Sequence, residues 1–292
     1  MDQPCNKAMV EVNLVAELAG HAKDAHYFHF PWGNMELPKV LTDIGITKFI
    51  VIEILIAAII VAVFIPMAVR LRGGLPAKGR FWNMMEVFLL YLKDNVIIPS
   101  IGSKKDATPY IPYLWTLFFF VLLCNLFGLV PWMGSPTAAI SVTLVLALLT
   151  LGLVLAAGIK RHGSIGFWTG MVPHVEGKVG PISLSLVLSP VLFVLEVFSF
   201  FVKHITLCIR LMANMFAGGL ILALLVAFIP MATALWGEWN PVAATFTWIS
   251  ITLLSYGGAV AMYFLKLLVA FLQAYIFTFL TSIYIGMAIH QH

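Results

Sequence analysis

The sequence predicts an all-α polytopic membrane protein, and three observations lead to this class. Of the 292 residues, 61% are hydrophobic and only 10% are charged, whereas a soluble domain is about 25% charged. The apolar residues form runs long enough to cross a ~30 Å hydrocarbon core as helices. Lys and Arg gather in loops on one predicted side of the membrane. We therefore expect five membrane segments plus an interfacial amphipathic helix.

Residues 1–46 form a polar arm ahead of the first segment. The arm holds six acids against three lysines, and it lacks the basic start and apolar core of a signal peptide. Three histidines in it, His21, His26 and His29, have no metal-site spacing, so we interpret them as surface residues. The cysteines likewise lack disulfide or metal-ligand spacing. No metal site or cofactor is therefore expected.

The membrane domain is predicted to occupy residues 47–289. The loop at 70–109 carries seven basic residues, so the positive-inside rule places it in the cytoplasm, with the N-terminus outside and the C-terminus cytoplasmic. Within this loop, residues 81–98 predict an amphipathic helix lying on the cytoplasmic membrane surface. The five predicted segments are 47–69, 112–132, 138–159, 183–229 and 242–289.

The last two segments are too long for ordinary upright spans. Helices over the apolar runs 191–229 and 242–289 would be about 58 Å and 72 Å long, roughly twice the core thickness. Tilting accommodates only a modest excess of length. Both helices are therefore expected to be strongly inclined, with another protein surface covering their polar sides.

A polar stripe runs along the first of these long helices. Glu196, Lys203 and Arg210 recur at intervals of seven, which returns a helix to within about 20° of its starting direction. An arginine in mid-bilayer costs roughly 2.5–3.5 kcal/mol, yet Arg210 has no acid within a turn or two. Its partner must come from a distant segment, from water or from another subunit, and the inclined striped helices favour another subunit.

Two motifs in this region resemble subunit a of the F-type ATP synthase. They are Arg-Leu-x-x-Asn-Met-x-Ala-Gly at 210–218 and Leu-Gln-Ala-Tyr-Ile-Phe at 272–277. The segment 125–131, which ends the second span, and the ladder of Glu196 and Lys203 match in order and spacing. The resemblance covers the chain from about residue 25 onward.

The resemblance implies a fold, a function and partners. Such a subunit is the stator half of a proton channel and is not itself catalytic. It faces a ring of c subunits, each with one mid-membrane carboxylate, and it joins the b subunit stalk and the rest of the complex. Two aqueous half-channels would pass protons to and from the ring, coupling their flow to rotation and ATP synthesis. The implied location is the inner membrane of a bacterial cell, in contact with lipid and with no nucleic acid.

By matching position, the resemblance also implies site residues. Arg210 is the essential cation, Asn214 and Gln273 are polar neighbours, and the inner half-channel includes Glu196, Ser199 and Lys203. The chain departs from the family pattern in the outer half-channel, where Gly219 and Lys266 replace the usual titratable pair. Gly128 also lacks an acid that some relatives have. A water path lined by Asn125, Ser255 and Tyr256 is our hypothesis for proton uptake there.

Three other functions are consistent with parts of the pattern. A secondary transporter or antiporter would use Arg210 to bind an anion, but it predicts an internal repeat, and the sequence shows none. A non-catalytic membrane anchor would leave the stripe without a purpose. A sodium-coupled version of the same subunit stays open, because ion choice depends on the surroundings of the ring carboxylate.

Overall fold

The computed structural model describes residues 27–30, 33–36, 47–72, 79–130, 134–170, 178–179, 182–234 and 241–290. The predictions for His21 and His26 lie outside these residues. The chain divides into two compact units, each described by itself below. The first unit is Met1–Ala57, Val121–Val142 and Leu211–Gln273, and the second unit is Ala58–Phe120, Thr143–Arg210 and Ala274–His292.

Each predicted membrane segment coincides with a helix. In chain order these helices are α3 (Lys48–Arg72), α7 (Ile111–Phe127), α8 (Ile140–Gly170), α9 (Leu184–Ala234) and α10 (Pro241–Ile289). By length and composition, α3, α8, α9 and α10 are the described helices that are apolar and long enough to cross a membrane. A span at α7 therefore stays a prediction.

Helix α7 is shorter than the predicted segment 112–132. It has 17 residues, which corresponds to about 25 Å. The helix ends at Phe127 because the chain then enters a turn, in which the amides of Gly128 and Leu129 donate to the carbonyls of Cys124 and Leu126. Pro131 follows, and a proline has no amide hydrogen to continue the helical pattern.

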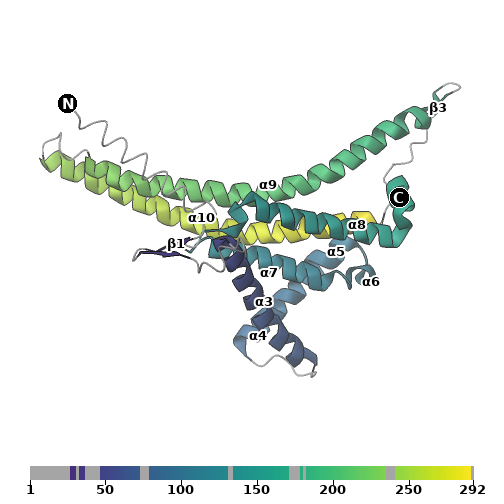
Figure 1. The fold of residues 1–292 in the computed structure, drawn as a ribbon, viewed down its shortest axis with the longest axis horizontal. Helices are drawn as coiled ribbons and strands as arrows, with labels where there is room; N and C mark the ends of the chain where they lie inside the picture. Colours follow the sequence, from purple (N-terminus) through teal and green to yellow (C-terminus); the bar gives the residue numbers. More distant parts are fainter. Residues whose placement is uncertain are drawn as a thin grey trace. The chain divides into compact units, whose positions relative to one another are not determined.

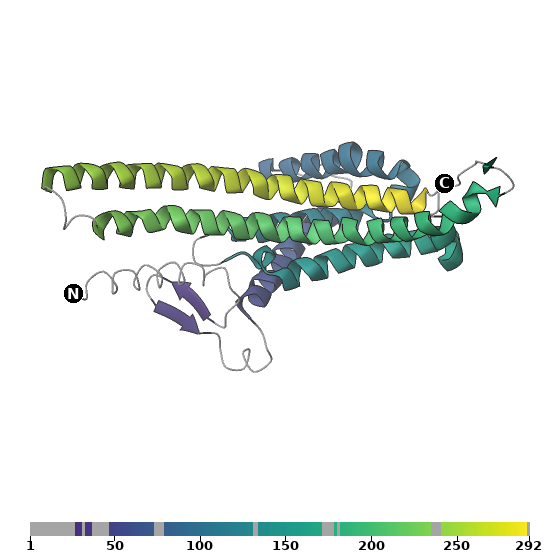
Figure 2. The same ribbon diagram turned by 90° about the horizontal axis from the view of Figure 1, so that it is seen from above.

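The two long helices have the lengths that the sequence predicts. Helix α9 has 51 residues and α10 has 49, and both are continuous. Their inclination to a membrane stays a prediction. In the first unit, residues 211–234 of α9 and 241–273 of α10 run antiparallel and side by side in both ribbon views (Figures 1 and 2). The Ser255 hydroxyl of α10 donates to the Leu225 carbonyl of α9.

Two short β-hairpins add to the helical fold, and the all-α prediction omits them. Strand β1 (Tyr27–Phe30) pairs antiparallel with β2 (Gly33–Glu36), and β3 (Lys178–Val179) pairs antiparallel with β4 (Ile182–Ser183). Each connection has only two residues, the length that suits a tight hairpin turn. Runs this short carry too few residues to show a period of two in the sequence.

The predicted amphipathic helix at 81–98 is present as a composite of helical elements in the second unit. Helix α4 (Arg80–Tyr91) continues into a π-helical stretch (Leu92–Ile97), followed by the short helices α5 (Ile98–Ile101) and α6 (Lys104–Ala107). The Phe88 ring of α4 lies 5.3 Å and 5.9 Å from the Phe118 and Phe119 rings of α7. The element therefore packs on α7, and its place at the membrane surface stays a prediction.

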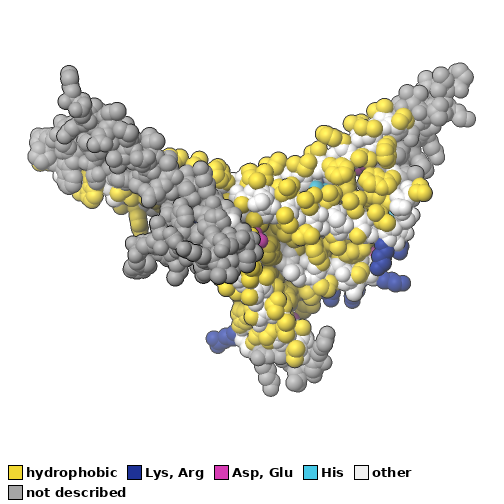
Figure 3. All heavy atoms as spheres, viewed as in Figure 1, with side chains coloured by type: hydrophobic (Ala, Val, Ile, Leu, Met, Phe, Trp, Pro, Cys, Tyr) yellow, Lys and Arg dark blue, Asp and Glu magenta, His cyan; other side chains and the backbone are white. Residues whose placement is uncertain are grey.

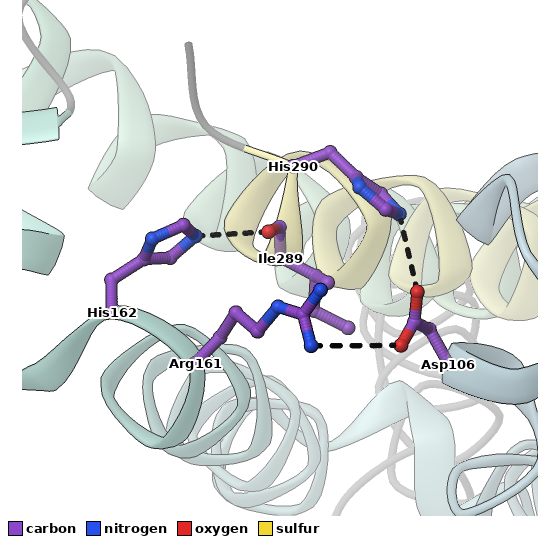
Figure 4. A network of polar contacts seen from close by, with 5 residues as sticks. All are labelled: Asp106, Arg161, His162, Ile289 and His290. Carbon is purple, nitrogen blue, oxygen red and sulfur yellow. Dashed lines mark hydrogen bonds and ion pairs between the residues drawn. The ribbon is translucent and has the colours of Figure 1, made fainter.

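Polar contacts hold the C-terminal end of α10 in the second unit (Figure 4). The Asp106 carboxylate of α6 lies 4.0 Å from Arg161 Nη1 of α8 and 3.8 Å from His290 Nε2. His162 Nε2 lies 2.9 Å from the Ile289 carbonyl oxygen. Gly163, with φ 77°, adopts the left-handed conformation that lets α8 turn just after these residues.

Side-chain types on the described surface agree with a membrane protein. Figure 3 shows a mainly hydrophobic described surface, on which Lys and Arg side chains are visible near α6 and the C-terminal part of α8, and also near α4. Lys104, Lys105, Lys160 and Arg161 in these elements are all exposed. Cationic side chains near the ends of apolar helices are consistent with a boundary between membrane and water, and its assignment to the cytoplasmic side stays a prediction.

The close approach of α10 to α5 in the second unit gives a stability prediction. A Cβ on Gly286 would lie 2.4 Å from the Ser100 carbonyl oxygen, a backbone atom. Because backbone cannot move aside cheaply, we expect Gly286→Ala to lower the free energy of unfolding by about 1–3 kcal/mol. Denaturant unfolding of the purified protein in detergent measures this cost. The matched control is Gly152→Ala, where a Cβ meets no atom within 4 Å, and equal stabilities of the two variants would contradict the packing argument.

Candidate functional site

The polar stripe on α9 is present in the second unit. Lys203 Nζ lies 3.9 Å from Glu196 Oε1, and both side chains are about half-buried. The seven-residue spacing along the stripe therefore brings Glu196 and Lys203 within ion-pair distance. Arg210 is also partly exposed on the same helix. In the described part of the second unit no carboxylate lies within ion-pair distance of its guanidinium.

The side of α9 next to this stripe faces other helices. His204, Leu207 and Cys208 are all buried. The Cys208 thiol donates a hydrogen bond to the Thr143 hydroxyl of α8 at 3.4 Å, and Cys208 and Cys124 are both free thiols. Within the second unit, α9 thus has one partly exposed side with ionised groups and one buried side with weakly polar groups.

In the first unit, α9 and α10 are joined by an amide pair. Asn214 Nδ2 donates to Gln273 Oε1 at 2.9 Å. Gln273 is 1% exposed, and its Nε2 has no hydrogen-bond partner among the described residues. The structure therefore brings together two residues that the motifs place 59 positions apart in the chain. The free Nε2 hydrogens give this pair a donor available to a further acceptor.

Lys266 of α10 packs against Gly218, which lies one helical turn beyond Asn214 on α9. Lys266 is 7% exposed, and a Cβ on Gly218 would lie 3.1 Å from its Cε. A Cβ on Gly219 would meet no atom within 4 Å. Sequence reasoning associates Lys266 with Gly219 by motif position, but Gly218 is the glycine that makes room for the lysine. No spacing along either helix indicates this contact, because it depends on how α9 and α10 are aligned against each other.

The three residues of the hypothesised outer path do not form one cluster in the described part of the first unit. Asn125 is fully buried, and its Oδ1 accepts a hydrogen bond from Thr137 at 2.8 Å. Ser255 is 4% exposed and its hydroxyl donates to the Leu225 carbonyl, whereas Tyr256 is 67% exposed. Adjacent helical residues point about 100° apart, so Ser255 and Tyr256 do not share a face.

The corner around Asn125 contains residues that sequence reasoning missed. Ser135 and Thr137 are both buried, and their hydroxyl oxygens lie 2.7 Å apart. A Cβ on Gly128 would lie 2.4 Å from Ser135 Cβ, so packing requires a glycine there. The clue in the sequence is the run of Ser, Pro and Thr at 135–137, which typically closes a turn by side-chain hydrogen bonds.

These features define a helical membrane protein with buried polar pairs on two long apolar helices and an arginine that no carboxylate pairs with in the described part of its unit. Residues 50–286 match the family described as ATP synthase A chain. The chain is similar to ATP synthase subunit a of Chlorobium phaeobacteroides, with 36% identity over 92% of this chain and 73% of the relative. It is also similar to subunit a of Myxococcus xanthus, with 34% identity over 100% of this chain and 93% of the relative. The chain therefore belongs to the ATP synthase A chain family, as its motifs indicate.

The contact between Gly218 and Lys266 gives a prediction with a built-in control. We expect Gly218→Val to lower the free energy of unfolding by about 1–3 kcal/mol, because the new side chain overlaps the lysine stem. Gly219→Val introduces the same side chain at the next residue, where it meets open space, and should lower the free energy of unfolding clearly less. Adding Lys266→Ala to Gly218→Val should recover part of the loss, because the two side chains are in contact. Denaturant unfolding in detergent measures all three, and equal losses for the two valine variants would refute the contact.

Proposed function

We propose that this chain is the stator subunit of a bacterial ATP synthase membrane sector, and that it forms two aqueous half-channels. These pass protons to and from mid-membrane carboxylates on a rotating ring of c subunits. The observation that carries the proposal is Arg210, a permanent cation on an apolar helix with no carboxylate partner in the described part of its unit, in a chain that belongs to this family.

The chemistry of such a cation explains directional proton flow. A ring carboxylate that faces lipid is protonated, because desolvation disfavours its charged form. The same carboxylate is ionised when it faces Arg210, since an opposite charge within ~4–6 Å favours the charged form. Arginine suits this role because it does not deprotonate and so cannot leak protons. A proton then crosses by riding the ring, and each one supplies about 2.3 kcal/mol per 100 mV.

The neighbouring residues take roles that fit their contacts. The Glu196–Lys203 pair, partly exposed, lines the inner half-channel together with Ser199. The hydrogen bond from Asn214 fixes Gln273, which leaves the Gln273 amide hydrogens free to orient an incoming carboxylate. The subunit spans the inner membrane with the N-terminus outside and the C-terminus cytoplasmic, beside the b subunit stalk.

Lys266 is assigned to the outer half-channel. Its ammonium group is largely removed from water and its stem packs on Gly218. In the described residues it forms no ion pair. Burial without a fixed counter-charge is the condition under which lysines act as acid–base groups, so Lys266 takes the place of the titratable pair that relatives use. Asn125 and Ser255 have hydrogen bonds within the protein and are weaker candidates.

Replacing the cation tests the proposal directly. We expect Arg210→Ala to abolish ATP synthesis driven by a proton gradient in liposomes that contain the complete ATP synthase, while the complex still assembles. The cause is loss of the charge that ionises each ring carboxylate. Arg80→Ala removes an exposed arginine at the start of α4 and should leave synthesis unchanged. Coupled synthesis at the normal rate in the Arg210 variant would refute the mechanism, and synthesis that requires a sodium gradient would instead indicate sodium coupling.

A second experiment addresses the outer half-channel. Lys266→Gln keeps a polar side chain of similar length but removes the titratable group, so we expect slower proton-driven ATP synthesis. Lys266→Met keeps the apolar stem that packs on Gly218 and should be slowed at least as much. If both variants synthesise ATP at the normal rate, Lys266 serves packing only. Rates are compared across a range of outside pH at constant gradient.

A further inference from the structure

The proposed proton path does not use His204, a histidine that is buried on α9 in the second unit. His204 is 3% exposed. The centroid of its ring lies 5.0 Å from that of Phe200 and 5.2 Å from that of Tyr284 on α10. Aromatic rings, rather than bulk water, therefore make up much of the surroundings of this imidazole.

The hydrogen bonding of His204 fixes its tautomer. Nδ1 lies 2.9 Å from the Phe200 carbonyl oxygen, and because a carbonyl only accepts, Nδ1 must carry a hydrogen. In the neutral ring Nε2 is then an acceptor with a lone pair. That atom is buried and has no hydrogen-bond partner among the described residues. A buried unsatisfied acceptor destabilises the fold, and a phenylalanine here would avoid that cost.

The groups around His204 link it to the polar stripe. Lys203, its neighbour on α9, pairs with Glu196 at 3.9 Å. Tyr284 of α10 is the titratable side chain in ring contact with His204, and it is close enough to Arg210 to interact with it electrostatically.

Among the described residues, α8 contacts this side of α9 through uncharged side chains. Its Phe167 ring lies 6.4 Å from Phe200, and its Thr143 hydroxyl contacts Cys208, one turn beyond His204 on α9. In the described part of the second unit, the groups next to His204 that carry or can carry a charge are thus Lys203, its neighbour in sequence, and Tyr284 on α10. A proton arriving on His204 would meet no carboxylate that neutralises it permanently.

We propose that His204 is a proton-binding site on the buried side of α9, in the inner part of the pathway. The Nε2 lone pair accepts a proton from water in the half-channel and forms an N–H bond, while the Nδ1–H bond to Phe200 stays intact. The rings of Phe200 and Tyr284 stabilise the resulting cation. Release returns the proton to water and the ring to its neutral tautomer. This inference rests on the proposed function, because it assigns a residue to that path.

Passive proton flow through the complete ATP synthase in liposomes, measured from pH 5 to 8, tests this site. His204→Asn keeps a polar group near the Nδ1 position and His204→Gln keeps one near Nε2, but neither side chain titrates. We expect both to slow the flow by roughly tenfold or more and to remove the inflection that a histidine produces between about pH 5 and 8. The control His162→Gln makes the same replacement at an exposed histidine and should keep the wild-type rate and pH profile.

Each result decides for or against the site. Wild-type flow and pH profile in either the Asn or the Gln variant would overturn the proposal, because hydrogen bonding alone would then suffice. If neither variant assembles, His204→Phe decides, since it keeps the ring contacts; an assembled Phe variant with normal flow also overturns it. Arg210→Ala in the same liposomes separates the two proposals. Normal ATP synthesis in that variant refutes the proposed function, whereas its loss together with normal flow in the His204 variants refutes this inference alone.

Discussion

The structure of this protein depends on how its buried polar groups find hydrogen-bond or ion-pair partners where water is absent. Where water cannot solvate a buried amide or charge, the protein must satisfy it or leave it available for function. The two long helices show both outcomes. Lys203 and Glu196 satisfy one another, and Asn214 satisfies one end of Gln273. In contrast, Gln273 Nε2 and His204 Nε2 have no partner among the described residues, and no carboxylate lies within ion-pair distance of the ionised Arg210 in the described part of its unit. These three groups are among those for which we propose roles in proton transfer.

The polar cluster near Asn125 differs from the site in its arrangement, although Asn125 Nδ2 also has no hydrogen-bond partner among the described residues. In that corner, hydroxyl groups of Ser135 and Thr137 bond to each other and to the Asn125 side-chain oxygen. Such a network stabilises a turn between two apolar helices. On α9 and on α10 the polar groups instead recur at helical spacing along each helix. Repetition along a helix face, more than burial alone, identifies the residues that could act in sequence on a moving proton.

Sequence reasoning predicted the helices well because long apolar runs have few alternatives in a membrane, and the seven-residue interval placed Glu196 beside Lys203. It predicted Asn214 and Gln273 as one site through motifs, and the structure places them in contact. It did not predict that Gly218, rather than Gly219, accommodates Lys266, because this depends on the register of two helices. It also assigned Ser255 and Tyr256 to one water path, although adjacent residues of a helix point to different faces. The alignment of α9 against α10 and the rotation of each helix about its axis arise from packing between the two helices. No pattern in a single sequence shows them directly.

The close contact of Gly286 with the Ser100 backbone has a mechanical consequence for α10. A helix wedged against a neighbouring carbonyl cannot slide along its axis or roll without first separating from it. The Asp106 contacts with Arg161 and His290 brace the same end. A stator subunit must resist the sideways force that a turning rotor exerts on it. A helix that is fixed at one end passes this force on to the helices that hold it. The glycine thus lets the second unit act as an anchor for its end of α10.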